Sequence, residues 1–322
     1  MQLYSFLSRF KKKRAQVVLM YHRIASPGVD PWELSVSPEN FEEHLRVLKG
    51  YDVISVKALS DILKNNTKNA GSSVAVTFDD GYRDNYLVAN PLLQKYNIPA
   101  TFFITSNTLG HAREFWWDAL ERICLQTKQL PSRLTLEQLY KSSWDIGKEH
   151  HKNGTSSLDL YFELCGLIRK IPATQQKIII KILEDWANNT DDRPEYLTMD
   201  KDELLDLQSN SLFTVGAHTM THPFLPEFSY TYQETEILGG IAFLETLTGK
   251  SINYLAYPHG GRDKKTLDII ANSSIELAFT TDPQQVKKDT PHFAVPRFQV
   301  GNWDGKTFEN NLVNWMSNSY LK

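Results

Sequence analysis

Short apolar stretches alternate with amphipathic helical patterns near the N-terminus of this chain, and this alternation restricts the fold more than any other feature. β-Branched and aromatic residues predict strands over 16–22, 74–78 and 100–105. Between them, apolar residues at helical spacing predict helices that start near Ser37 and Asn85. Such alternation is typical of a parallel sheet against which the connecting helices pack.

The alternation resumes in the C-terminal third of the chain. Strands are expected over 213–218, 254–258, 277–280 and 293–300, and helices over 232–248, 264–272 and 308–316. With a further strand over 51–56 and a helix over 56–63, the chain holds roughly seven strand–helix units. No Gly-x-Gly-x-x-Gly motif follows the first strand, which disfavours an open dinucleotide-binding sheet. The predicted fold is α/β, a distorted (β/α) barrel of about seven strands.

Residues 111–207 interrupt this rhythm. Helical spacing recurs over 114–125, 158–170 and 174–188. No good strand pattern separates these helices. We interpret 111–207 as a helical insertion into a barrel formed by 15–110 and 208–322. The pair Trp116-Trp117 within it is expected to serve packing in preference to a ligand contact.

Composition argues against several classes of protein. A net charge of -3 and a pI near 6.3 disfavour general nucleic-acid binding. The two cysteines, Cys124 and Cys165, lack the spacing of a metal site or a disulfide framework. We therefore expect a reducing compartment, the cytoplasm.

The first fourteen residues combine apolar and basic side chains. Leu3, Phe6, Leu7 and Phe10 fall on one face of a short helix, and the basic run 11–14 follows them. This order differs from that of a secretory signal, so no signal peptide is predicted. Residues 1–14 are expected to pack on their own domain, with a peripheral membrane contact as the alternative. No apolar run reaches the roughly 18 residues that a membrane-spanning helix needs.

Two predicted strands end in residues that can hold a metal ion. Asp79-Asp80-Gly81 follows one strand, and His218-Thr-Met-Thr-His222 follows another. Two histidines four residues apart, joined by a carboxylate, form a facial site for a divalent ion. The second carboxylate can then take a proton from water, whose pKa such an ion lowers to about 7. The alternative for Asp-Asp-Gly is an Asx turn with a helix cap.

These two motifs resemble the first two motifs of the NodB-homology polysaccharide deacetylases, carbohydrate esterase family 4. The stretches concerned are Thr77-Phe-Asp-Asp-Gly81 and the His-x-x-x-His segment. The resemblance implies a metal-dependent hydrolase that removes N-acetyl groups from an amino sugar or glycan. It further implies that Asp79 is the catalytic base and that Asp80, His218 and His222 bind the metal. Zinc is the ion we expect, with cobalt, nickel, manganese or iron as alternatives, and the partner is an N-acetylated saccharide.

The third motif of that family is only partly present. The family usually has Arg-x-Pro-Tyr/Phe, whereas residues 256–260 read Ala-Tyr-Pro-His-Gly and lack the arginine. In the family this arginine orients the base, and the backbone N–H after the proline holds the oxyanion. The second role falls to His259, whose backbone suffices for it. Arg297 is the candidate for the first role, with a strand-end ion pair as its alternative. Tyr257 is expected to contact the substrate.

The general acid and an aromatic sugar contact complete the expected site. No Leu-x-His motif, the usual source of the acid, occurs in the C-terminal third. Leu19-Met-Tyr-His22 instead resembles the rearranged poly-N-acetylglucosamine deacetylases, in which this histidine lies on the first strand. First and last strands are neighbours in a barrel, so His22 can reach the same position. Trp303 is a candidate for stacking on a sugar, and packing under the C-terminal helix is the alternative.

Other functions remain open at this stage. A sugar deformylase or an O-acetyl esterase would use the same chemistry on another bond. Phosphoryl transfer by an aspartyl nucleophile normally uses Asp-x-Asp, and the adjacent carboxylates here disfavour it. A non-catalytic glycan-binding relative is the alternative from a different class, and the missing arginine is the feature in its favour.

Overall fold

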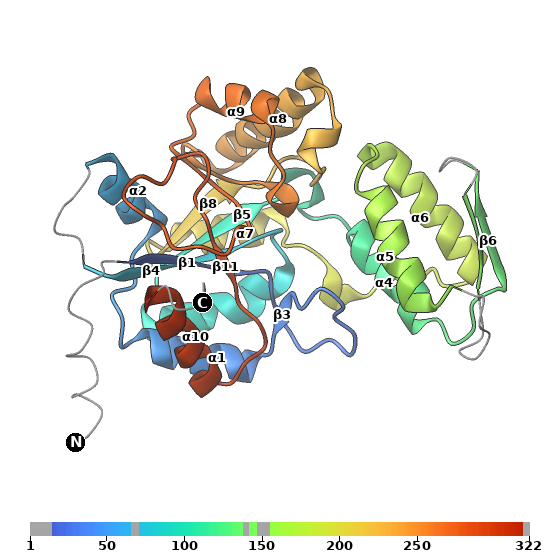
Figure 1. The fold of residues 1–322 in the computed structure, drawn as a ribbon, viewed down its shortest axis with the longest axis horizontal. Helices are drawn as coiled ribbons and strands as arrows, with labels where there is room; N and C mark the ends of the chain where they lie inside the picture. Colours follow the sequence, from blue (N-terminus) through green and yellow to red (C-terminus); the bar gives the residue numbers. More distant parts are fainter. Residues whose placement is uncertain (1–14, 66–70, 138–141, 147–154, 318–322) are drawn as a thin grey trace.

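A seven-stranded parallel sheet forms the centre of the molecule (Figure 1). The computed structural model describes residues 15–65, 71–137, 142–146 and 155–317. The sheet has the order β10-β9-β8-β5-β4-β1-β11. Its strands are β1 (Gln16–Tyr21), β4 (Ser73–Phe78), β5 (Ala100–Ile104), β8 (Phe213–Ala217), β9 (Tyr254–Ala256), β10 (Leu277–Phe279) and β11 (Phe298–Gln299). These strands are buried almost throughout, as expected for a parallel sheet covered on both faces.

The two ends of the sheet approach each other through one short segment. Val295 forms a parallel bridge with Phe279 of β10. Three residues later, Phe298 of β11 pairs with Leu19 of β1. The segment 295–299 thus links the first strand to the last, and the predicted distorted (β/α) barrel is confirmed.

The two faces of the curled sheet have different neighbours. Val74, Val76 and Phe78 of β4 belong to a large apolar cluster with the surrounding helices. Ala75 lies on the inner face, in a second cluster with Phe103 and other inward side chains. Because side chains alternate along a strand, Thr77 and Asp79 share the inner face with Ala75. The alternation therefore directs the Asp79 carboxylate into the barrel.

Helices cover the outside of the sheet. They are α1 (Pro38–Leu48), α3 (Asn90–Tyr96), α7 (Lys201–Ser209), α8 (Tyr230–Thr248), α9 (Lys264–Ala271) and α10 (Gly305–Ser317), while α2 (Val56–Lys64) packs on the inner cluster. Figure 1 shows α8 and α9 on one side of the sheet and α1 and α10 on the other. The start of α1 follows from its sequence, because the Ser37 side chain accepts a hydrogen bond from the Asn40 N–H and Pro38 occupies the first turn.

Two expected strands differ in the structure, and the helix expected over 85–96 has the irregular start that Pro91 indicates. The strand predicted over 51–56 is only a single bridge between Val53 and Val74, because Ser55 already caps α2. The strand predicted over 293–300 is regular only in β11, since its first half crosses to β10. The helix expected over 85–96 begins as a π-helical turn, Asn85–Ala89, just before Pro91, which has no N–H to continue a regular hydrogen-bond ladder.

The insertion between β5 and β8 has its own apolar core. It contains α4 (Trp116–Glu121), the π-helical turn Arg122–Gln126, α5 (Ser157–Ile168) and α6 (Ala173–Ala187). It also contains an antiparallel hairpin, β6 (Arg133–Leu136) with β7 (Ser142–Asp145), so the expectation of no strand there was wrong. The alternation Arg-Leu-Thr-Leu is only four residues long, which hid this half-buried strand.

The C-terminal end of the predicted insertion belongs to the barrel. Leu204 and Leu207 of α7 pack in the same cluster as the sheet, although both lie within 111–207. Shorter elements complete the described chain: β2 (Arg23–Ile24) pairs with β3 (Ser35–Val36), and 3-10 turns lie at Ser106–Thr108, Pro194–Tyr196, Leu225–Glu227 and Pro258–Gly260. Among the described residues, no helix has the length and apolarity needed to span a membrane. The membrane contact expected of residues 1–14 lies outside the described residues.

Candidate active site

Three of the predicted metal ligands meet at the C-terminal ends of β4 and β8. The ligand atoms of Asp80, His218 and His222 all lie within 4.8 Å of one another. Asp80 Oδ1 lies 3.3 Å from Nε2 of each histidine. This oxygen is buried and makes no hydrogen bond to any described residue. A buried, unpaired carboxylate oxygen between two imidazole nitrogens is the environment that a divalent cation satisfies.

The hydrogen bond of His218 fixes which ring nitrogen can bind a metal. His218 Nδ1 lies 2.8 Å from the Ala256 carbonyl oxygen. A carbonyl can only accept, so Nδ1 carries the proton and Nε2 keeps its lone pair. That lone pair lies on the side of Asp80. Metal-binding histidines are commonly oriented in this way, and the donor set therefore fits a divalent metal ion.

The backbone around these ligands is unusual. Among the described residues, seven other than glycine have a positive φ, and Asp80, Thr219, His222 and His259 are four of them. Gly81 follows Asp80 at φ +85°, and a Cβ there would lie 3.1 Å from Ile104 Cδ1. Left-handed backbone is costly for such residues and tends to collect at functional sites.

The turn that carries His222 depends on a residue that sequence reasoning missed. Glu236 of α8 is buried, and its carboxylate accepts hydrogen bonds from the N–H groups of Met220 and Thr221 and from the Thr221 hydroxyl. The His222 N–H in turn bonds the Thr219 hydroxyl. Glu236 looks like any helix-surface glutamate in the sequence, so no signal pointed to it.

Asp79 and Arg297 form a fully buried ion pair inside the barrel. Two guanidinium nitrogens of Arg297 donate to the two Asp79 carboxylate oxygens, each at 2.7 Å. The same guanidinium donates to Thr77 Oγ1 and, through Nε, to the Thr280 carbonyl oxygen. Burial raises the pKa of Asp79, but the charge and hydrogen bonds of Arg297, together with His218 and His22, more than offset this, so the pKa lies below its ordinary value. The carboxylate is thereby held ionised and in one orientation.

The two remaining polar residues expected at the site lie among these groups, His22 near Asp79 and His259 near His222. His22 directly follows β1, and its imidazole interacts electrostatically with Asp79, His222 and His259. The His259 ring lies 4.6 Å from the His222 ring, and its backbone is left-handed with φ +56°. Burial lowers the pKa of His222 well below its ordinary value. The structure thus brings seven predicted residues together at one end of the barrel: Asp79, Asp80, His218, His222, His22, His259 and Arg297.

Two expected substrate contacts lie elsewhere. Tyr257 is fully buried in the helix-facing cluster, and its hydroxyl donates to the Phe293 carbonyl oxygen. Its side chain follows the alternation of β9 outward, away from the inner face, so the expected substrate contact was wrong. Trp303 is half-buried against the same cluster, with its ring 6.0 Å from that of Trp315 in α10. Trp303 therefore agrees with the alternative to sugar stacking, which was packing under the C-terminal helix.

A second group that sequence reasoning missed connects the insertion to the metal ligands. The Trp117 ring lies 4.6 Å from the His222 ring, and its indole N–H donates to the Tyr82 hydroxyl. Tyr82 in turn donates to Asp118 Oδ2 at 2.7 Å. Tyr82 directly follows Asp79-Asp80-Gly81, and this position in the sequence could have indicated that it lies near the site. Trp117 thus packs, as expected of the pair, but it packs on His222, one of the predicted metal ligands.

Asp118 should make stability depend on pH. Burial raises its pKa to about 8, so the folded protein keeps a proton that the unfolded chain loses near the ordinary value of 3.8. The contribution of the Asp118 carboxyl to the free energy of unfolding is therefore largest at low pH and is lost as the pH rises towards 8. Asp118→Asn keeps an acceptor for Tyr82 but cannot ionise. We expect its stability relative to wild type to grow by up to about 1.4 kcal/mol per pH unit between pH 5 and 8.

Urea unfolding of both proteins across that pH range checks this expectation. The matched control is Asp268→Asn, which makes the same chemical change at an exposed position on α9. A constant difference between Asp118→Asn and wild type would show that the buried carboxyl does not retain its proton.

Comparisons with known proteins agree with this geometry. The polysaccharide deacetylase family model matches residues 66–154 and 173–278, more than half of the chain. The poly-β-1,6-N-acetyl-D-glucosamine N-deacetylase of Staphylococcus aureus is 30% identical over 168 residues, which cover 46% of this chain and 54% of that protein. A polysaccharide deacetylase-like protein of Bacillus subtilis is 40% identical over 96 residues, covering 29% of this chain and 33% of that protein. The matched regions thus span only a third to about a half of these curated relatives.

Solved structures share the fold over almost the whole chain. The Streptococcus pyogenes deacetylase PplD, in complex with acetate, matches with a TM-score of 0.61 and 20% identity, over 95% of this chain and 99% of that one. IcaB from Ammonifex degensii matches with a TM-score of 0.61 and 19% identity, over 95% and 98% of the two chains. With the family match and the barrel already described, the conclusion is that this chain belongs to the polysaccharide deacetylase family.

Proposed function

We propose that this protein is a metal-dependent hydrolase that removes N-acetyl groups from an amino sugar or glycan. One observation carries the proposal: a buried Asp80–His218–His222 ligand set adjoins an ionised Asp79 that Arg297 holds in place. The Staphylococcus aureus relative is named for N-deacetylation of poly-β-1,6-N-acetyl-D-glucosamine. That name supports an N-acetylated glucosamine saccharide as the substrate class of this chain.

Asp80, His218 and His222 would hold the metal, and zinc is the ion we propose. When bound, a divalent ion supplies Lewis acidity that polarises a carbonyl and lowers the pKa of water to about 7. The protonated Nδ1 of His218 leaves Nε2 available for this ion. All three ligands are buried, which limits their exposure to bulk solvent.

The other residues have roles in proton transfer and charge stabilisation. Asp79 accepts the proton of the attacking water, and the two hydrogen bonds from Arg297 keep its carboxylate aimed into the barrel. The backbone N–H of His259 donates to the oxyanion that forms on the former amide carbonyl. His22 gives a proton to the departing amine, so the products are acetate and a free amino sugar.

The contacts of Arg297 weaken the case for a non-catalytic relative. That reading relied on the missing arginine of the third motif. Here a guanidinium reaches the same carboxylate from the segment 295–299, and it is bidentate and fully buried. A binding protein has no need for an ionised aspartate buried beside a metal ligand set.

Removal of one ligand tests the proposal. Asp80→Ala should lower both the bound zinc and the release of acetate from N-acetylglucosamine oligomers, the latter by about 100-fold or more. Metal analysis and an acetate assay on the same preparations measure the two effects. Asp268→Ala, an exposed aspartate on α9, is the matched control and should keep both.

Two outcomes would contradict the proposal. One is a variant without metal that still releases acetate at the wild-type rate. The other is a wild-type protein that cleaves acetate esters or N-formyl sugars while leaving N-acetyl sugars intact, which would indicate the esterase or deformylase.

A further inference from the structure

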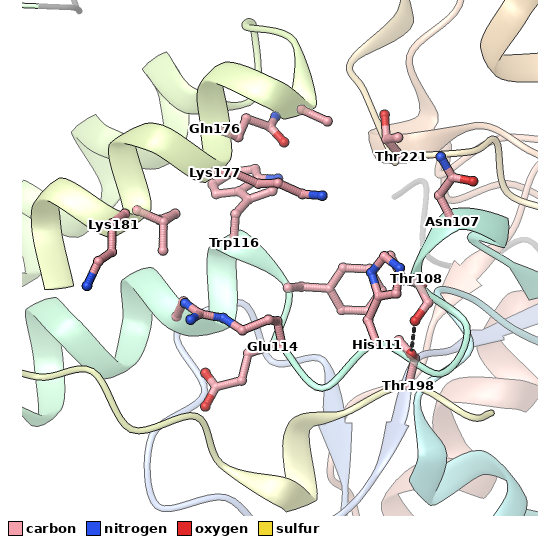
Figure 2. Close-up of a pocket in the computed structure, with 15 residues that line it drawn as sticks. Asn107, Thr108, His111, Glu114, Trp116, Gln176, Lys177, Lys181, Thr198 and Thr221 are labelled. Carbon is pink, nitrogen blue, oxygen red and sulfur yellow. Dashed lines mark hydrogen bonds between the residues drawn. The ribbon is translucent and has the colours of Figure 1, made fainter.

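A cavity of about 620 Å³ lies between the barrel and the insertion, outside the ligand set described above. Figure 2 shows its two sides. Asn107, Thr108, Thr198 and Thr221 line it from the barrel, and Trp116, Gln176 and Lys177 line it from the insertion. None of these residues belongs to the machinery proposed for deacetylation.

One wall of the cavity is apolar and partly aromatic. Phe115, Trp116, Ala119 and Ile180 contribute to it. The indole N–H of Trp116 is buried and has no hydrogen-bond partner among the described residues. Buried donors are nearly always paired, and no described residue provides an acceptor for this N–H. A ligand could provide one. An aromatic wall with an unused donor suits a sugar, which has apolar ring faces and hydroxyl acceptors.

The charges around the cavity leave one lysine without a partner. Arg113 pairs with Glu184 and Asp192, and Lys181 pairs with Asp185. Glu114, the acidic lining residue, is neutralised by Arg193 and Arg122.

Lys177 has no ion pair or hydrogen bond within the described chain, and Figure 2 shows its ammonium group extending into the cavity. Among the described residues that line the cavity, the Lys177 ammonium group is thus a cation without an acidic partner. It favours a ligand with a negative group.

The cavity adjoins the candidate active site through short connections. Thr221, which lines it, immediately precedes the ligand His222. On the other side, Phe115 stacks on Trp117 with ring centres 4.3 Å apart, and Trp117 packs on His222. One turn and one aromatic stack thus connect the cavity to the predicted metal ligands.

We propose that this cavity binds a second sugar unit of the substrate, one that carries an anionic group. The inference rests on the proposed function, because it takes the metal ligands as the position of the cleaved N-acetyl group. The anionic group is a carboxylate or a phosphate, since Lys177 would pair with either. Trp116 supplies the ring face and the N–H donor, and Lys177 supplies the charge.

Direct binding measurements test this proposal. In an Asp79→Asn background, which keeps the saccharide intact, calorimetry compares N-acetylglucosamine oligomers in neutral, carboxylate-bearing and phosphate-bearing forms. We expect one anionic form to bind about tenfold more tightly than the neutral form, and Lys177→Gln to remove this preference. Trp116→Phe keeps a ring but lacks the N–H, and should weaken binding of all three forms.

Lys306→Gln is the matched control, because Lys306 is exposed on α10, far along the chain from the cavity. It should bind as the parent protein does, and thermal melting of each variant separates misfolding from lost contacts. Equal affinity for all three forms, or a preference that survives Lys177→Gln, would overturn the proposal. The readout is binding, so a wild-type protein without acetate release would count against the proposed function alone.

Discussion

Replacing Asp79 by asparagine should lower acetate release by about 10²–10⁴-fold while the content of the proposed metal stays unchanged. Asparagine has the same shape, and its amide oxygen can still accept a hydrogen bond from Arg297. It cannot accept a proton from the attacking water. The ligand set does not include Asp79, so metal content should stay at the wild-type level. Acetate release and metal analysis on one preparation measure both parts.

The control for this substitution is a second buried aspartate that pairs with an arginine. Asp84 accepts from Arg23 Nε at 3.0 Å and lies outside the proposed machinery. Asp84→Asn makes the same chemical change in a comparable setting, so it reports what the loss of a buried negative charge costs in stability. We expect it to retain acetate release in the fraction that folds. Asp79→Asn with more than about a tenth of wild-type activity would exclude Asp79 as the general base.

The four most informative residues could be found from the sequence because they lie in short motifs at strand ends. Asp79 and Asp80 directly follow β4, and His218 directly follows β8. Parallel strands present their C-terminal ends at one edge, so recognising the strands was enough to bring these residues together. His222 needed only the spacing of its turn.

Longer-range features could not be found in this way. Tyr257 lies in a motif that resembles a functional one, yet the alternation of β9 turns it outward into the helix-facing cluster. Glu236 and Trp117 reach the metal ligands from α8 and from the insertion. Their partners depend on how separate helices and strands pack together. Local sequence patterns do not show this packing.

The pairing of Arg297 with Asp79 could not be derived from local sequence patterns. It was a candidate only because an arginine was missing elsewhere. Its place depends on segment 295–299, which leaves β10 and joins β1 and so closes the barrel. From there the side chain crosses the inner face, near Phe103 and Phe279, to the end of β4. Arg297 therefore both orients Asp79, the proposed base, and connects segment 295–299 to the strands of the sheet.

Replacing Arg297 by methionine should therefore affect both stability and the pH dependence of activity. It leaves the Asp79 carboxylate buried without its partner, and breaking a buried pair in this way costs about 3–5 kcal/mol of unfolding free energy. Urea unfolding at pH 7 measures this loss. Arg262→Met is the matched control, because Arg262 forms a partly exposed pair with Asp282, and the loss of such a pair should cost about 0–1 kcal/mol.

The pH profile distinguishes a structural arginine from one that also keeps the base ionised. In the wild type, Arg297 holds the pKa of Asp79 below its ordinary value, so activity should persist towards acid pH. Without Arg297, the pKa-lowering effect of its charge and hydrogen bonds is lost and burial raises that pKa relative to the wild type, so the acid limb of kcat/KM should move to higher pH. The stability cost should shrink as the pH falls, because a protonated Asp79 no longer needs a cation. A variant that loses stability but keeps the wild-type acid limb would mean that Arg297 only closes the barrel.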